Sequence, residues 1–207
     1  MNELQILKSD IMKSRVVESE LDIGTPLVAG EILLKVDKFG FSANNVTYAV
    51  AGDQLGYWQF FPASSNENET WGIIPVWGFA DVVASSAEGV DAGERIFGYY
   101  PTNSYLKMQN IKVLENRLVD GAEHRSKLPP GYNTYRRVGK EADYDSSMDN
   151  MRMLLWPLYI TSFCLWDSLQ RNAWHGAKQV IVISASSKTS IGLSYALAAD
   201  TDAPTSI

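Results

Sequence analysis

The sequence predicts a mixed α/β fold in which a small β-barrel precedes the first part of a βαβ nucleotide-binding unit. Two observations support this prediction. Short segments rich in β-branched and aromatic residues, separated by glycines, occupy residues 30–100, which is typical of a small barrel. Residues 179–192 contain a hydrophobic segment, a run of small polar residues and the start of an apolar helix, which is the order found in the first half of a βαβ unit.

The composition is that of a globular protein and excludes several functional classes. The chain has 207 residues, 45% of them hydrophobic and 20% charged, enough for one full domain and part of another. A net charge of −6 argues against nucleic-acid binding, which needs clustered cations. We expect a cytoplasmic protein without a membrane segment, because the sequence contains neither a long apolar run nor an apolar signal core. One cysteine excludes an internal disulfide, and with only two histidines a zinc site would need carboxylates.

The first hundred residues are expected to form mainly strands. Ser42 is a candidate N-cap for a short helix that follows Gly40. An aromatic-rich region then contains Trp58, Phe60, Phe61, Trp71 and Trp77, which we expect to fill the barrel core; walls of a substrate pocket are the alternative. The expected strands are residues 1–23 (one or two strands), 31–39, 78–85 and the end of 90–100.

The middle of the chain changes from polar to strongly apolar. Residues 128–131 mark a break, and residues 133–149 are polar enough to lie on the surface. Arg136 and Arg137 are interpreted as a solvated basic turn, with anion binding as the alternative. Residues 151–169 predict a nearly buried helix that Pro157 starts or kinks, with Cys164 in the core.

The residues after the hydrophobic segment only partly match a dinucleotide-binding turn. Residues 180–183 show no polar alternation, which predicts a strand covered on both faces. The G-x-G-x-x-G spacing would fall on Ser187, Thr189 and Gly192, so only the last glycine is present. The residues alone leave two alternatives: an ordinary capped helix, or a turn whose hydroxyls and Lys188 hold a phosphate.

Taken in order, four segments resemble the medium-chain dehydrogenase/reductase superfamily. Residues 30–36 are similar to an early barrel strand, 74–83 to the strand that usually starts with Gly-His-Glu, 92–99 to a glycine turn, and 154–162 to the helix before the nucleotide domain. The resemblance implies a GroES-like β-barrel followed by an incomplete Rossmann-type βαβ unit. More narrowly, the chain is similar to a bacterial branch of unassigned function, with which no substrate is associated.

Two departures from the zinc enzymes of this superfamily bear on the chemistry. Phe41-Ser42 stand where those enzymes place a zinc-binding cysteine, and Trp77-Gly78-Phe79 stand where they place Gly-His-Glu. The resemblance therefore points to the zinc-free quinone oxidoreductases and enoyl reductases. It implies an NADP- or NAD-dependent oxidoreductase without zinc that transfers hydride to an enone, quinone or ketone. Lys188 and the neighbouring serines slightly favour NADP.

The resemblance also assigns candidate site residues. Asn44 and Tyr48 would lie at the substrate mouth, with Tyr48 donating a hydrogen bond or proton and Asn44 holding a carbonyl. Thr161 would face the nicotinamide. The alternatives are that Asn44 and Tyr48 only satisfy a turn and cover the core, and that the Thr161 hydroxyl bonds within its helix. The pyrophosphate candidates are Ser186, Ser187, Lys188, Thr189, Ser190 and Gly192.

We expect three segments: residues 1–130 as the barrel, 131–175 as a connecting segment with an interdomain helix, and 176–207 as the start of the nucleotide-binding domain. The expected substrate is a small apolar carbonyl compound, and the expected assembly is a homodimer at full length. As an N-terminal fragment, the chain is not expected to be active alone. The alternative from another functional class is a non-catalytic GroES-like module for ligand binding or oligomerisation, with a degenerate cofactor turn.

Overall fold

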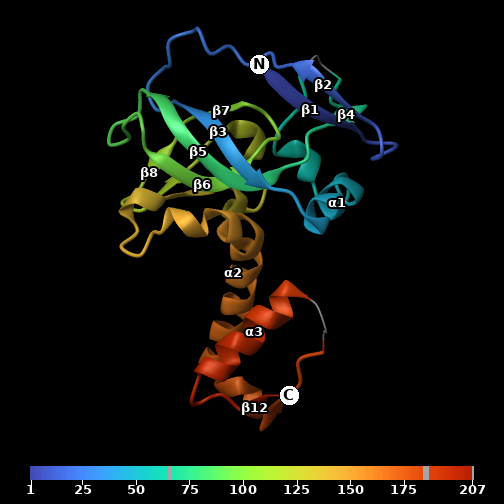
Figure 1. Cartoon of the computed structure of the whole chain (residues 1–207), viewed down its shortest axis with the longest axis vertical. Helices are drawn as coiled ribbons and strands as arrows, with labels where there is room; N and C mark the ends of the chain where they lie inside the picture. Colours follow the sequence, from blue (N-terminus) through green and yellow to red (C-terminus); the bar gives the residue numbers. More distant parts are fainter. Residues whose placement is uncertain (65–66, 184–186, 207) are drawn as a thin grey trace. The chain divides into compact units, whose positions relative to one another are not determined.

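The computed structural model describes residues 1–64, 67–183 and 187–206 (Figure 1). Contacts within the chain define two compact units, Met1–Asn150 and Met151–Ile207. The three segments expected from the sequence stay a prediction, because a division by contacts does not separate the connecting segment from the parts it joins.

A seven-stranded antiparallel sheet curls through the first unit and forms the predicted GroES-like barrel (Figure 1). The strand order is β7-β3-β5-β6-β10-β9-β8, so strands far apart in the sequence are neighbours. The three strands expected between residues 31 and 100 correspond to β3, β5 and β6. The strands are β3 (Ile32–Gly40), β5 (Val76–Ser85), β6 (Arg95–Tyr100), β7 (Tyr105–Met108), β8 (Lys112–Val113), β9 (Arg117–Val119) and β10 (Thr134–Arg137).

The barrel core forms because alternate residues of these strands point inward. Its aliphatic part includes Ile32, Leu34, Val76 and Ile96, all fully buried. The aromatic-rich region lies mainly in the core, as the sequence suggested: Trp58, Phe60 and Phe61 are buried, while Trp71 and Trp77 are half-buried.

The first strands form a separate three-stranded sheet. Its order is β2-β1-β4, so β2 is an edge strand. The buried Glu3 carboxylate ties this sheet to neighbouring segments, because it accepts hydrogen bonds from Ser64 (2.8 Å) and Asn103 (3.1 Å). The strands are β1 (Asn2–Leu7), β2 (Ser14–Glu18) and β4 (Trp71–Gly72).

The interpretation of Arg136 and Arg137 as a solvated basic turn is wrong, since both residues belong to β10. Arg137 is buried, and its guanidinium donates to both carboxylate oxygens of Glu94 at 2.7 and 2.8 Å. Arg136 pairs with Glu141. Tyr135 and Arg137, two residues apart, lie on the buried face of β10, and Arg136 lies on the other face, which a reading of charge alone did not anticipate.

Short helices connect the strands of the first unit. The predicted helix after Gly40 is α1 (Ala43–Val50), and Ser42 is its N-cap as expected. The 3₁₀ segments are η1 (Tyr57–Gln59), η2 (Glu123–Arg125), η3 (Pro130–Asn133), η4 (Val138–Lys140) and η5 (Ser146–Met148).

The second unit is built around two helices that cross closely. A Cβ atom at Gly192 would lie 2.8 Å from Ser162 Oγ, so the glycine permits the close approach. Ser162 is fully buried, and its Oγ lies 2.6 Å from the carbonyl oxygen of Thr189. The elements are α2 (Asp149–Arg171, which begins in the first unit), η6 (Ala173–Gly176), β11 (Gln179–Val180), α3 (Lys188–Ala199) and β12 (Thr205–Ser206).

Two burial predictions for this unit are wrong. The expected strand at residues 180–183 is reduced to β11, and Ile181 and Ile183 are 65% and 91% exposed. The expected buried helix, α2, carries exposed apolar residues, among them Phe163 and the free Cys164. A parallel strand is buried only when both faces are covered, and β12 is the only strand that pairs with β11 among the described residues.

Candidate functional site

The chain turns from β3 into α1 at the position where the sequence placed the substrate mouth. Ser42 Oγ accepts from the Asn44 backbone amide at 3.4 Å. The Asn45 side chain accepts from the Ser42 amide at 2.7 Å and donates to the Pro75 carbonyl at 3.0 Å. Asn45 therefore fixes the turn, while Asn44 is half-buried. Asn44 and Tyr48 lie one helical turn apart and share one side of α1.

Tyr48 joins four other aromatic residues in a group that we call the tyrosine cluster: Tyr48, Tyr57, Trp77, Tyr99 and Tyr132. The Tyr48 ring lies 4.6 Å from that of Tyr57 and 5.9 Å from that of Tyr99, between ring centres. The Tyr99 ring in turn lies 5.1 Å from Trp77 and 4.7 Å from Tyr132. Five separate elements (α1, η1, β5, β6 and η3) thus bring four phenols and one indole together.

Burial keeps three phenols of the tyrosine cluster neutral. It raises the pKa values of Tyr48, Tyr99 and Tyr132, and neighbouring phenols raise those of Tyr99 and Tyr132 further. For Tyr48 the Trp77 indole, which lies against the phenol, partly opposes this shift in pKa. Neutral phenols donate hydrogen bonds, so the tyrosine cluster is suited to bind a neutral oxygen acceptor.

The two segments that the resemblance aligns with zinc ligands carry aromatic residues here, Phe41 and Trp77. Trp77 packs on Phe97, with ring centres 5.8 Å apart, and Phe41 is exposed. In the part of the chain that the structure describes, no group of three or more histidine, cysteine or carboxylate side chains is arranged to hold a metal ion.

The cofactor candidates gather at the N-terminus of α3 in the second unit. Ser187 is the N-cap, and Lys188, Thr189 and Ser190 form the first turn. Ser186 lies outside the described residues. Gly192 allows α3 to approach α2, whereas the third glycine of a dinucleotide motif serves helix-to-strand packing. The N–H groups of the first turn of α3, its hydroxyls and the exposed Lys188 are donors of the kind that bind a pyrophosphate.

Thr161 makes the contact that the alternative interpretation described. Its Oγ1 donates to the carbonyl oxygen of Pro157 at 3.2 Å, and the residue is exposed. This bond suits the position, because a hydroxyl four residues after a carbonyl can reach it within a helix. A role of Thr161 toward a nicotinamide stays a prediction.

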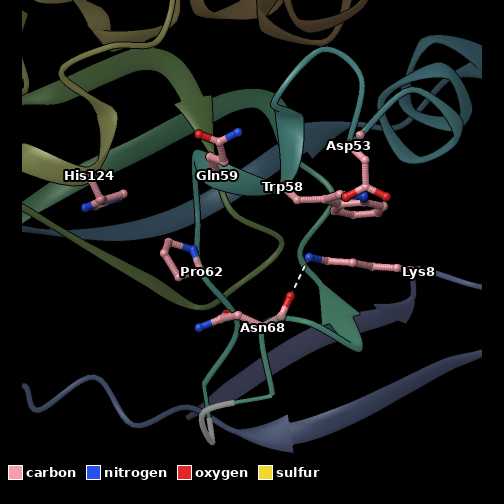
Figure 2. Close-up of a pocket in the computed structure, with 8 residues that line it drawn as sticks. Lys8, Asp53, Trp58, Gln59, Pro62, Asn68 and His124 are labelled. Atoms are coloured by element: carbon pink, nitrogen blue, oxygen red, sulfur yellow. Dashed lines mark hydrogen bonds between the residues drawn. The ribbon is translucent and has the colours of Figure 1, made fainter.

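Sequence reasoning missed a polar pocket of about 390 Å³ in the first unit. Figure 2 shows Lys8 pointing toward Asn68, with His124 at the opposite end; the Lys8 ammonium donates to the Asn68 carbonyl oxygen. The pocket contains Trp58, whose indole fits against Gly52 and Gly72: a Cβ atom at either glycine would come within 2.3 Å of it. Two glycines separated by 20 residues give no sequence pattern that reveals this packing.

No helix among the described residues is long and apolar enough to cross a membrane. The comparison with curated proteins gives no match.

The solved structures that are similar to the chain include the following two. One, the crystal structure of JamJ enoyl reductase (apo form), shares 10% identity with a TM-score of 0.47, over 95% of this chain and 50% of that chain. The other, the crystal structure of glucose dehydrogenase from Haloferax mediterranei, shares 14% identity with a TM-score of 0.51, over 99% of this chain and 56% of that chain. The chain thus spans about half the length of these structures, and the second likeness shows that its fold is similar to the corresponding part of that dehydrogenase.

A family of proteins matches at the level of sequence. Its description is "Protein of unknown function (DUF2855)", and the match covers residues 39–207, well over half of the chain. The chain belongs to the DUF2855 family.

Proposed function

We propose that this protein is a zinc-independent, NAD(P)H-dependent oxidoreductase that reduces a small apolar enone, quinone or ketone. The observation that carries the proposal is the tyrosine cluster. It brings neutral phenols, including Tyr48, together with Trp77, which belongs to the segment that the resemblance aligns with Gly-His-Glu of the zinc enzymes. Hydrogen-bond donors can stabilise the negative charge that develops on a carbonyl oxygen during reduction, which is the role a Lewis acid has in the zinc enzymes.

The proposed substrate-binding residues belong to the first unit, and the proposed cofactor-binding residues belong to the second. Tyr48 would donate to the substrate oxygen, and the half-buried Asn44 would orient the carbonyl. Ser186, Ser187, Lys188, Thr189 and Ser190 would bind the pyrophosphate at the start of α3, with Thr161 toward the nicotinamide. A bound nicotinamide would supply the hydride.

The alternative is a non-catalytic ligand-binding module. The observation that favours it is the cofactor turn, where Ser187 and Thr189 replace two glycines of the motif and Gly192 packs against Ser162. Without those glycines, the backbone of the turn cannot approach a pyrophosphate as closely as in the glycine-rich motif.

Nucleotide titration separates the two functions. Protein made from the complete coding sequence would be titrated with NADPH and NADH, with nucleotide fluorescence as the readout. Lys188→Ala should weaken NADPH binding about fivefold or more and NADH binding less, because an exposed ammonium contacts a phosphate with modest energy. Lys178→Ala, an exposed lysine outside α3, is the matched control. If the protein binds neither NADPH nor NADH, the reductase proposal is refuted. If Lys188→Ala weakens the binding of both nucleotides equally, the preference for NADP is removed.

Turnover tests the role of Tyr48. NADPH oxidation with 2-cyclohexenone or 1,4-benzoquinone should fall about tenfold or more in Tyr48→Phe, since general-acid and hydrogen-bond donors commonly contribute at least this much. Tyr105→Phe changes a half-buried tyrosine outside the tyrosine cluster and should leave turnover unchanged. Nucleotide binding without turnover of any carbonyl compound would favour the binding module.

A further inference from the structure

Two donor residues on neighbouring strands of the tyrosine cluster have no acceptor within hydrogen-bond distance in the described part of the chain, although the indole of one, Trp77, lies near enough to the Tyr48 phenol to oppose the rise in its pKa. The hydroxyl of Tyr99 and the indole Nε1 of Trp77 are both closed off from solvent, and neither has a hydrogen-bond partner among the described residues. Tyr99 is fully buried. The two residues are direct cross-strand partners in β5 and β6, and their ring centres are 5.1 Å apart. The two strands therefore present both donors on one face of the sheet.

Other tyrosines in the same barrel show that this lack of a partner is not general. Tyr100 and Tyr135 are as deeply buried as Tyr99. The Tyr100 hydroxyl donates to the Ile96 carbonyl at 3.0 Å, and the Tyr135 hydroxyl donates to the Tyr99 carbonyl at 2.6 Å. A buried donor without an acceptor costs free energy, so a pair of them in a folded protein calls for a reason such as a missing ligand.

The surroundings of the pair define the chemistry of such a ligand. Rings of Tyr48, Tyr132 and Phe97 contact the two donor residues. None of the five carries a formal charge while the phenols stay protonated, and burial favours that state by raising the pKa of Tyr99. An uncharged acceptor oxygen on a flat, unsaturated ring satisfies both the donors and the aromatic walls.

We propose that Tyr99 and Trp77 together bind the carbonyl oxygen of a planar cyclic ketone or enone. The relevance of this site to reduction rests on the proposed function, whereas ketone binding at the site needs no cofactor. Two fixed donors on one oxygen form the arrangement of an oxyanion hole, and they would add to the single donor of Tyr48. The strand positions of both residues hold them more firmly than a loop would.

Tyr132 is the side chain that must move to admit the ligand. It is half-buried, its ring contacts those of both Tyr99 and Trp77, and its hydroxyl lies 3.3 Å from that of Tyr57. The hydroxyl pair at this distance is a weak hydrogen bond, so displacement of the ring costs mainly its packing on neighbouring aromatic rings, which the flat ring of the ligand would replace. The ligand oxygen would then take two donors that have no partner beforehand.

Calorimetric titration with two matched probes tests the proposal. The probes are 1-indanone, a planar aryl ketone, and indane, which has the same ring system without the oxygen. Tyr99→Phe should weaken 1-indanone binding about tenfold, the effect of losing one or two good hydrogen bonds, and leave indane binding unchanged. Trp77→Phe, which removes the indole donor, should likewise weaken 1-indanone binding and leave indane binding unchanged. Tyr135→Phe, which removes a hydroxyl that already has its partners, should leave the binding of both probes unchanged.

Thermal unfolding of the free protein gives a second, independent readout. Tyr99→Phe should keep or raise the melting temperature, because it removes a buried donor that has no acceptor. Tyr135→Phe should lower it, because that change removes the hydroxyl that donates to the Tyr99 carbonyl and accepts from the buried Arg125 guanidinium. A purely structural hydroxyl at position 99 would lower the melting temperature and leave probe selectivity unaltered.

The outcomes separate this inference from the proposed function. If Tyr99→Phe binds 1-indanone as tightly as the unchanged protein, or melts as low as Tyr135→Phe, the donor pair is not a ligand site, whether or not the protein reduces carbonyls. If the ketone selectivity depends on Tyr99 but no carbonyl compound is ever reduced, the site stands and the reductase proposal falls. Absence of 1-indanone binding by the unchanged protein would also overturn the inference.

Discussion

The two units of the protein treat their apolar residues in opposite ways. In the first unit the inward positions of the strands are closed, and Ile32, Phe79 and Ile96 have no exposed surface. In the second unit Ile183 and Tyr195 are 91% and 70% exposed. Both units have ordinary apolar patterns in the sequence. The difference shows that a periodic pattern specifies which face of an element is apolar, whereas burial depends on a second surface that covers it.

The glycines show the same contrast at the level of single atoms. In the first unit a Cβ at Gly98 would lie 2.1 Å from a ring carbon of Tyr135, a fully buried aromatic residue. In the second unit a Cβ at Gly192 would meet the end of a serine side chain at 2.8 Å. Barrel packing should therefore tolerate substitution less than the contact between α2 and α3.

The largest expected effect is that of Gly98→Ala. The added methyl group would force the Tyr135 ring out of its place, and this ring also contacts Tyr100 with ring centres 5.4 Å apart. Overpacking at such a site should lower the free energy of unfolding by about 3 kcal/mol. Urea unfolding followed by near-UV circular dichroism measures the loss. Gly139→Ala is the matched control, since a Cβ added there would meet no atom within 4 Å beyond its chain neighbours, and an equal loss in both variants would contradict the packing argument.

The next effect is electrostatic and depends on pH. Burial alone would raise the pKa of Glu94, but hydrogen bonds from Arg137 outweigh it, so the pKa lies below its ordinary value of 4.5. A carboxylate of this kind stabilises the folded state fully above the pKa it has when unfolded, and this contribution is lost as the pH falls through its folded pKa. Stability should thus decrease as the pH is lowered from about 5.

Glu94→Gln isolates this contribution. At pH 7 the change should cost about 2 kcal/mol, because it leaves the buried guanidinium of Arg137 without its carboxylate. The variant should also lose less stability than the unchanged protein between pH 5 and pH 3, as approximate limits for a carboxylate. Chemical unfolding at a series of pH values measures both. Parallel pH curves for the two proteins would show that the Glu94 carboxylate does not titrate as proposed.

Much of the barrel follows from its sequence because the signals are local. Ser42 caps α1 through a contact two residues away, and Gly40 ends β3 next to it. Strand β10 was missed because two adjacent arginines resemble a solvated turn. The burial of Arg137 depends on Glu94, 43 residues earlier, and no local pattern reveals a partner at that distance.

The candidate site was predicted only in part, for the same reason. Tyr48 was found through a resemblance in a short segment, and the structure places it in the tyrosine cluster. Tyr99 and Tyr132 were not singled out, because their contacts join Tyr48 to Tyr99, 51 positions later, and Tyr99 to Tyr132, and both require the barrel to be closed. An acceptor-free donor is likewise invisible in a sequence, since it is defined by what surrounds it.

The smallest expected effect is that of Gly192→Ala in the second unit. Alanine favours a helix over glycine by about 1 kcal/mol, which offsets the crowding of Ser162. The crowded atom is the end of a short side chain, yet it is held near the carbonyl oxygens of Leu158 (3.1 Å) and Thr189 (2.6 Å), so its movement is not free. We expect a net change within about 1 kcal/mol, measured by amide hydrogen exchange in α3. Gly192→Leu, which cannot be accommodated by rotation of a hydroxyl, should lose clearly more protection. If Gly192→Ala instead destabilises α3 as strongly as Gly98→Ala destabilises the barrel, the helix crossing is as closely packed as the barrel core, and the contrast between the units is confined to their exposed faces.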